Sequence, residues 1–309
     1  MNAKPDCTIC LMKQYLQICR LSGLEESELN AAFSDLIKRL PEVSFSMTPP
    51  EMAAFITGMI KKASGVSDPY KTIKKNSNEA ALKLYPELKL RVERSGHPFA
   101  EALCLAIAGN LIDFGAKASL NLNEALEEIL SQPLLHKLEE GLGLEDALFQ
   151  LDTFYNELKK AESVLYLGDN AGEIVFDRIF IETLIREFPD KKITFAVRGG
   201  PALNDALLED AEDVGISEIV ETVSSGCAAA GTVLSKCSED FLKRLGAADI
   251  IIAKGQGNYE SLSGSPYENA WFLFRIKCQV VAESAGGPEG KLVLKKNEAS
   301  ILDPIGRHV

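Results

Sequence analysis

Two aspartates and an asparagine in the second half of the chain are the residues best suited to hold a metal ion. Asp169 and Asn170 follow the apolar run 164–167, and Asp205 lies 36 residues after Asp169. That distance is about one strand–helix–strand unit, so the side chains can meet at the tips of adjacent strands. Carboxylate and amide oxygens are ligands that Mg²⁺ and Mn²⁺ prefer. Asp and Asn after a strand are also common as plain turn and helix-cap residues.

Cationic groups follow the same predicted strands. Arg198 can grip a phosphoryl group with two hydrogen bonds, Lys254 can add a point charge, and the amides that open a helix at Gly172 form an anion site. Each has a plainer explanation alone: a surface ion pair, a solvated lysine, a turn glycine. What favours a metal or phosphate site is that all three loops fall at predicted strand ends. We expect Asp169, Arg198 and Lys254 to be catalytic, through either covalent attack or an activated water.

The elements that must position these residues differ between the two halves of the chain. The first half predicts successive helices, over residues 48–62, around 103–114 and over 145–160. The second half alternates short apolar runs with helical patterns, which indicates a mostly parallel sheet covered on both faces. The runs are 164–167, 193–197, 219–223, 250–253 and 279–282, and the helices 172–187, 203–211 and 235–245. We expect an α/β protein, with a helical domain at 1–155 and a Rossmann-like α/β metal-binding domain at 156–309.

Composition limits the classes of partner. The chain has 309 residues, 46% hydrophobic and 25% charged, and a formal net charge of −12. Such a balance argues against nucleic acid and anionic membranes, because both need clustered Lys and Arg. The first residues lack the order of a signal peptide, and no apolar run reaches the roughly 20 residues of a membrane span. We therefore expect a cytoplasmic protein, while the oligomeric state is left open by the sequence.

Three loop motifs in combination resemble the damage-control phosphatase family, long called domain of unknown function 89. They are Gly168-Asp-Asn-x-Gly-Glu173, Arg198-Gly-x-Pro-x-x-Asn-Asp205 and Lys254-Gly-x-Gly-Asn-x-Glu260. The resemblance covers nearly the whole chain. It extends to Asp68-Pro-Tyr70, Lys74, Asn78 and 108–114, and to Cys7-x-x-Cys10 and Lys277-Cys278, which resemble the mainly prokaryotic branch.

The resemblance implies a helical domain packed on a three-layer αβα domain. It implies hydrolysis of small phosphorylated metabolites, either sugar phosphates or damaged cofactor-like phosphates, with Mn²⁺, Co²⁺, Ni²⁺ or Mg²⁺. The family's metal ligands map onto Asp169, Asn170 and Asp205. Substrate binding is then expected from the following residues: Asn110 and Asp113 facing the cleft from the helical domain, and Gly172, Glu173, Asn258 and Glu260 in the loop motifs.

The pair Cys7-x-x-Cys10 is half of a four-thiolate zinc site, and the chain lacks the second half. Cys278 or Cys19 could complete a three-thiolate cluster. The resemblance makes Cys7, Cys10 and Cys278 the natural set, as a second site with a structural or redox role. Seven cysteines in total form an odd number, which does not suit a disulfide framework.

Two alternative functions are compatible with the same Rossmann-like fold. One is an S-adenosylmethionine-dependent carboxyl methyltransferase, which would want a Gly-x-Gly loop after the first strand; this chain has Gly168-Asp169-Asn170 there instead. The other is a protein that binds a phosphorylated metabolite without turning it over. Binding of S-adenosylmethionine would identify the first, and product binding without phosphate release the second.

Overall fold

The computed structural model describes residues 1–109, 124, 127, 130–131, 135–137 and 144–299. Its helices and strands within those ranges are α1 (Pro5–Leu21), α2 (Glu26–Arg39), η1 (Leu40–Glu42), α3 (Pro49–Ser64), α4 (Lys71–Arg94), α5 (Pro98–Ala108), α8 (Leu151–Lys160), β1 (Ser163–Leu167), α9 (Glu173–Glu187), β2 (Lys192–Val197), α10 (Leu208–Asp213), β3 (Glu221–Ser224), η3 (Leu234–Lys236), α11 (Glu239–Ala247), β4 (Ile250–Lys254), α12 (Gln256–Leu262), β5 (Ala270–Arg275), α13 (Gln279–Ala285) and β6 (Leu292–Lys296). None of these helices combines the length and the apolar character needed to cross a bilayer.

A single six-stranded sheet forms the centre of the molecule, in the order β3-β2-β1-β4-β5-β6. The first five strands are parallel, and β6 pairs antiparallel with β5 at the edge. β1 lies between β2 and β4, with Leu167 opposite Ala196 and Ala253. The loops that leave these three strands therefore start side by side at one edge of the sheet, where open parallel sheets bind ligands.

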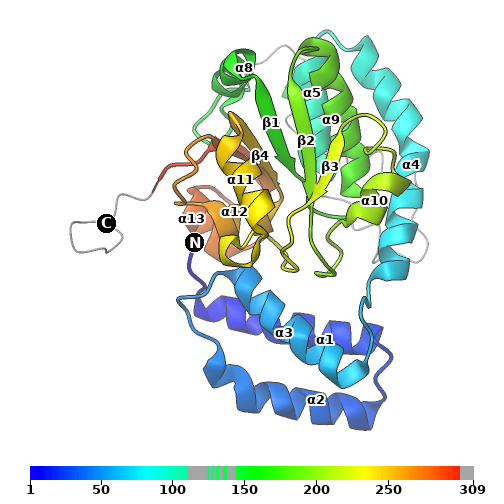
Figure 1. Cartoon of the computed structure of the whole chain (residues 1–309), viewed down its shortest axis with the longest axis vertical. Coiled ribbons are helices and arrows are strands. Elements are labelled where there is room, and N and C mark those ends of the chain that lie inside the picture. Colours follow the sequence, from blue (N-terminus) through cyan, green and yellow to red (C-terminus); the bar gives the residue numbers. More distant parts are fainter. Residues whose placement is uncertain (110–123, 125–126, 128–129, 132–134, 138–143, 300–309) are drawn as a thin grey trace, which may run out of the picture.

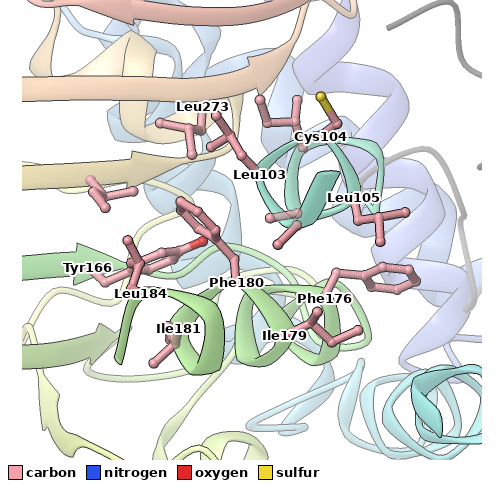
Figure 2. Packing of buried hydrophobic residues seen from close by; sticks show 14 of the residues in the cluster. Leu103, Cys104, Leu105, Tyr166, Phe176, Ile179, Phe180, Ile181, Leu184 and Leu273 are labelled. Carbon is pink, nitrogen blue, oxygen red and sulfur yellow. The ribbon is translucent and has the colours of Figure 1, made fainter. Parts of the chain in front are cut away.

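Helices cover both faces of the sheet and give three layers (Figure 1). On one face α4, α5, α8 and α9 share a hydrophobic cluster with alternate residues of β1, β2, β4 and β5, among them Tyr166 and Leu273. Figure 2 shows this packing, with Leu103 and Leu105 of α5 beside Phe176 and Phe180 of α9. On the other face α11, α12 and α13 pack on the intervening strand residues. The expected Rossmann-like three-layer αβα architecture is confirmed.

The N-terminal helices divide into two groups. α1, α2 and α3 form their own hydrophobic cluster and lie beneath the sheet layers in Figure 1, where α3 contacts α12. α3 begins as the sequence predicts, because the Thr48 hydroxyl accepts from the Glu51 amide and the Glu51 carboxylate accepts from the Thr48 amide. α4 and α5 instead join the cluster that covers the sheet. The boundary near residue 155 stays a prediction, and α4 and α5 pack against elements on its other side.

The prediction of a strand over residues 279–282 is wrong. These residues begin α13, which runs from Gln279 to Ala285 and ends at Gly286 in the left-handed conformation. A run of four apolar residues fits a buried helix turn as well as a strand, so its periodicity could not decide. The sheet is completed instead by β5 and β6, which the sequence did not predict as strands. The helix expected over 145–160 begins only at Leu151.

Candidate functional site

Backbone pairing beyond the strand ends brings Asp169, Asn170 and Asp205 together. Asn170 and Asp205 form an isolated antiparallel bridge. On either side of it, the Ala206 amide donates to the Asp169 carbonyl at 2.7 Å and the Ala171 amide donates to the Asn204 carbonyl at 2.9 Å. The loops after β1 and β2 are thus joined as one unit, and the three predicted ligand residues lie in that unit.

Arg198 ties the two aspartates to each other. Its Nε donates to Asp205 Oδ2 at 2.6 Å, and its Nη2 donates to Asp169 Oδ1 at 3.3 Å. Nη1 donates to Asn258 Oδ1 at 2.9 Å. The guanidinium is buried, so these charge-assisted bonds fix the geometry of the site from its inner side. Arg198 holds the aspartates directly, in addition to any contact it makes with a phosphoryl group.

Acidic groups in the site repel one another. Burial raises the pKa of Asp169 to about 8, and the charges of Asp205 and Glu173 act in the same direction. Burial also raises the pKa of Asp205, although Arg198 opposes the rise. A divalent cation between these oxygens would relieve that repulsion. The donor set of two carboxylates and the half-buried Asn170 amide therefore fits a hard cation.

Glycine at position 255 makes room for Asp169. A Cβ atom there would lie 1.9 Å from Asp169 Oδ2, far inside van der Waals contact. Gly255 also has a φ of +80°, a conformation that other residues rarely adopt. The loop after β4 can therefore pass behind the carboxylate only because this residue has no side chain.

Lys254 is placed differently from the phosphate-binding role that we predicted for it. Its ammonium is fully buried and donates to Glu173 Oε1 at 2.6 Å, Asp177 Oδ1 at 2.6 Å and the Ala106 carbonyl at 2.7 Å. Burial alone would lower the pKa of Lys254, but the charges of Asp177 and Glu173 reverse this and raise it. All three ammonium protons are engaged by the protein, which makes Lys254 an internal support of Glu173.

The remaining predicted substrate residues fall in several places. The Gly172 amide donates to Asn78 Oδ1 at 2.7 Å, so this N–H already has a protein acceptor. Asn258 is buried and, besides its bond from Arg198, donates to the Lys254 carbonyl at 2.7 Å. The Glu260 carboxylate accepts from Gln256 Nε2 at 2.8 Å, away from these bonds. Asn110 and Asp113 lie outside the described residues.

A second buried group connects α4 to the site. Asn78, which accepts from Gly172, also donates to Asp210 Oδ1 at 2.9 Å. Lys74 forms ion pairs with Asp210 at 3.2 Å and with Asp68 at 3.1 Å. Of these residues only Asp210 went unnoticed in the sequence. Asp68, Lys74 and Asn78 belong to the N-terminal part of the family resemblance, and their contacts hold α4 against the loop of Gly172.

The three cysteines proposed as a second site are free thiols. Burial raises the pKa of Cys10, and the charges of Cys278, Glu260 and Cys7 act in the same direction. Cys7 Sγ accepts from the Lys4 amide at 3.4 Å. Among the described residues no three His, Cys, Asp or Glu side chains are arranged to hold a metal ion. The role of this cluster stays a prediction.

Sequence reasoning missed two residues of the site's interior, Asp177 and Tyr166. The Tyr166 hydroxyl donates to Asp177 Oδ1 at 2.7 Å, and Asp177 shares Lys254 with Glu173. Asp177 follows Glu173 by four residues on α9, so the two carboxylates lie on one helix face. An acid among the mostly apolar residues of the buried face of α9 was the available signal.

Comparison with known proteins decides the family. The model of the damage-control phosphatase ARMT1-like domain matches residues 3–293. The chain belongs to this family. A solved structure, of a DUF89 family protein from Pyrococcus horikoshii, superposes with a TM-score of 0.83 at 30% identity, covering 96% of this chain and 100% of that one.

Relatives of similar length place the chain within the family. An uncharacterized protein of Methanocaldococcus jannaschii is 34% identical, covering 96% of both chains. A damage-control phosphatase of Archaeoglobus fulgidus is 32% identical, covering 96% of this chain and 99% of its own. A damage-control phosphatase of Pyrococcus horikoshii is also 32% identical, with the same coverage. Similarity along nearly the full length of both partners confirms the resemblance seen in the loop motifs.

Proposed function

We propose that this protein is a divalent-metal-dependent phosphatase of small phosphorylated metabolites. Asp169, Asn170 and Asp205 would hold the cation. The observation that carries the proposal is the Asn170–Asp205 bridge, which joins the loops after β1 and β2 and sets two buried, mutually repelling aspartates beside an amide. The names of the relatives support phosphate-ester hydrolysis as the reaction.

The bound cation would supply Lewis-acid stabilisation of charge on a phosphoryl oxygen. The protein's own groups prepare the place for it. Arg198 holds both aspartates at fixed angles, and Glu173 accepts from Asn170 Nδ2 at 3.2 Å, which orients the amide. Because the site is buried and preorganised, these groups do not have to rearrange during the reaction.

Mn²⁺, Co²⁺, Ni²⁺ and Mg²⁺ are the candidate ions, since the donors are oxygens of carboxylate and amide type. Sugar phosphates and damaged cofactor-like phosphates are the candidate substrates. The net charge of −12 disfavours nucleic acid as a substrate, because phosphate backbones need an extended basic surface. A cytoplasmic location stays part of this proposal.

The test is a phosphate-release assay over sugar phosphates and phosphorylated cofactor fragments. Metal-free protein, prepared with EDTA, is assayed alone and with each of the four ions. We expect no turnover without metal, recovery with at least one ion, and no recovery in Asp169→Asn. Full activity in the chelated protein would exclude the proposed site.

The same preparation separates the two alternatives. Calorimetry with S-adenosylmethionine would detect a methyltransferase. Tight binding of a phosphorylated product, with no phosphate released under any of the four ions, would identify a binding protein without turnover.

A further inference from the structure

A chain of hydrogen bonds runs from the interior of the sheet to the predicted metal ligands. Tyr166 on β1 donates to Asp177, and Lys254 on β4 donates to both Asp177 and Glu173. Glu173 Oε2 in turn accepts from Asn170 Nδ2 at 3.2 Å. Each step joins different elements, so the position of Asn170 is linked to groups deep in the core.

Every interior member of this chain is excluded from solvent. Lys254, Asp177 and Tyr166 are 0% exposed and Glu173 is 2% exposed. In such surroundings a charge interacts strongly with its partners, since little solvent screens it. One ammonium serves two carboxylates, so the strength of its bond to Glu173 depends on how much of its charge Asp177 engages.

Asp177 is incompletely satisfied. Its Oδ1 accepts two hydrogen bonds, but its Oδ2 has no partner among the residues that the structure describes. Leaving a buried carboxylate oxygen unpaired is unfavourable, and such groups in native proteins call for a specific explanation. An apolar residue at this position would serve packing better. Because Asp177 binds Lys254 at 2.6 Å, and Lys254 also binds Glu173, a role for Asp177 in the site is the better explanation.

We propose that Asp177, held by Tyr166, is a positioning residue for the metal site. It shares the Lys254 ammonium with Glu173 and so sets the place and the charge of the Glu173 carboxylate. Glu173 and Asp169 together engage the Asn170 amide nitrogen, at 3.2 and 2.9 Å, which fixes the direction of the Asn170 carbonyl oxygen. This inference rests on the proposed function, because it assigns Asn170 to the cation.

Asp177→Asn tests the proposal with little change in shape. Without the second carboxylate, the ammonium moves wholly to Glu173 and weakens the hold of Glu173 on Asn170. Groups that orient metal ligands typically change metal affinity or activity by about 10- to 100-fold when removed. We expect Mn²⁺ affinity, measured by calorimetry on the metal-free protein, to fall about 10-fold, with kcat reduced and KM for the phosphate ester little changed.

Two further variants complete the series. Tyr166→Phe removes only the hydroxyl that holds Asp177, and we expect a loss of Mn²⁺ affinity of roughly two- to fivefold. Glu182→Gln is the matched control: it lies on the same helix, five residues after Asp177, and pairs with Lys89 and Arg178 on the outer side. We expect its Mn²⁺ affinity and activity to equal those of the wild type, with circular dichroism confirming the fold of all variants.

The outcomes distinguish failure of the proposed function from failure of the positioning role of Asp177. Wild-type protein that binds no divalent ion would overturn the proposed function and this inference with it. Wild-type protein that binds Mn²⁺, with Asp177→Asn binding it equally well, would overturn the positioning role alone. If Asp177→Asn does not fold, Tyr166→Phe decides: unchanged Mn²⁺ affinity overturns the role, and a loss that Glu182→Gln does not share supports it.

Discussion

Two buried lysines in this protein each face two carboxylates, and the two groups differ in how well they are satisfied. Lys254 lies 2.6 Å from both Glu173 and Asp177, whereas Lys74 lies 3.1 Å from Asp68 and 3.2 Å from Asp210. The Lys254 group sits under the predicted ligands. The Lys74 group joins α4 to α10.

Around Lys74 the acids have additional donors. Asp210 accepts from Asn78 and from the Leu207 amide, and Asp68 accepts from the Tyr70 amide. Around Lys254, by contrast, one oxygen of Asp177 has no hydrogen-bond partner within the part of the chain that the structure describes. A fully hydrogen-bonded ionic group serves stability, whereas an incompletely bonded one beside a site is better explained by function. The comparison therefore favours a structural role for the Lys74 group and supports the positioning role that we propose for Asp177 in the Lys254 group.

The largest expected effect is on activity, in the pair Asp205→Asn and Asp210→Asn. Asp205→Asn removes a predicted ligand and should cost more than the roughly 10- to 100-fold typical of groups that only support ligands. Asp210→Asn should cost far less activity but should lower the melting temperature. Phosphate release and thermal unfolding of both variants are the measurements. Equal activity losses would contradict the distinction between the predicted metal ligands and the Lys74 group.

A second pair concerns the glycine behind Asp169. Gly255→Ala drives a methyl group into the carboxylate, and a displacement of about 1 Å in a site can cost about 100-fold in rate. Gly286→Ala is the control, because Gly286 has a φ of +81° yet nothing within 4 Å of its Cβ position. Both should lose about 1 kcal/mol of stability. Loss of activity in both would mean that backbone strain, not contact with Asp169, is the cause.

The third pair measures stability. Lys254→Met leaves two buried carboxylates without their cation, and Asp177 Oδ2 already has no partner among the described residues; breaking such a group typically costs about 3–5 kcal/mol. Lys74→Met leaves acids that keep other donors, and we expect roughly 1–3 kcal/mol. Urea unfolding of the metal-free variants gives both free energies. A larger loss of unfolding free energy in Lys74→Met than in Lys254→Met would contradict the distinction between the two lysine groups.

The smallest effect is the pH dependence of Asp177. Burial raises the pKa of Asp177 from 3.8 to about 6, although Lys254 opposes the rise. A carboxyl with a raised folded pKa stabilises the protein most below its unfolded pKa, and that contribution is lost as pH rises through the folded value. Relative to Asp177→Asn, wild-type unfolding free energy should therefore fall by roughly 1–3 kcal/mol between pH 4.5 and 7.

Urea unfolding of both proteins at several pH values checks this. Between about pH 4.5 and 7 the unfolding free energy of the wild type should fall relative to that of Asp177→Asn, because only the wild type has a carboxyl at this position. Outside this range the difference between the two proteins should change little. A constant difference between the two proteins would show that Asp177 keeps an ordinary pKa when folded.

β1, β2 and β4 were predictable because they are apolar and end in glycine-containing loops, whereas the parallel strand β5 was missed. Val164 and Ile250 begin such runs, and both lie in the sheet. The edge was not predictable. β6 reads Leu-Val-Leu-Lys-Lys, with no clear alternation, and Gln279–Ala282 is too short for its periodicity to separate strand from helix.

In the candidate site, the meeting of Asp169, Asn170 and Asp205 follows from the ends of adjacent strands. The partners of Lys254 do not follow from sequence. They depend on α5 presenting the Ala106 carbonyl and on α9 turning Glu173 and Asp177 toward β4, which are contacts between elements remote in the chain. A sequence motif can identify a charged residue such as Lys254, but which residues of opposite charge pair with it depends on how the helices and strands pack.

The Asn170–Asp205 bridge has a consequence for how members of this family can diverge. It fastens the two loops that carry the proposed metal ligands, so we expect a substitution in either loop to shift the other as well. We therefore expect changes in substrate preference to arise outside these loops, on elements that have a hydrophobic cluster of their own, such as α1–α3. Chemistry and selectivity can then evolve on different timescales within one chain.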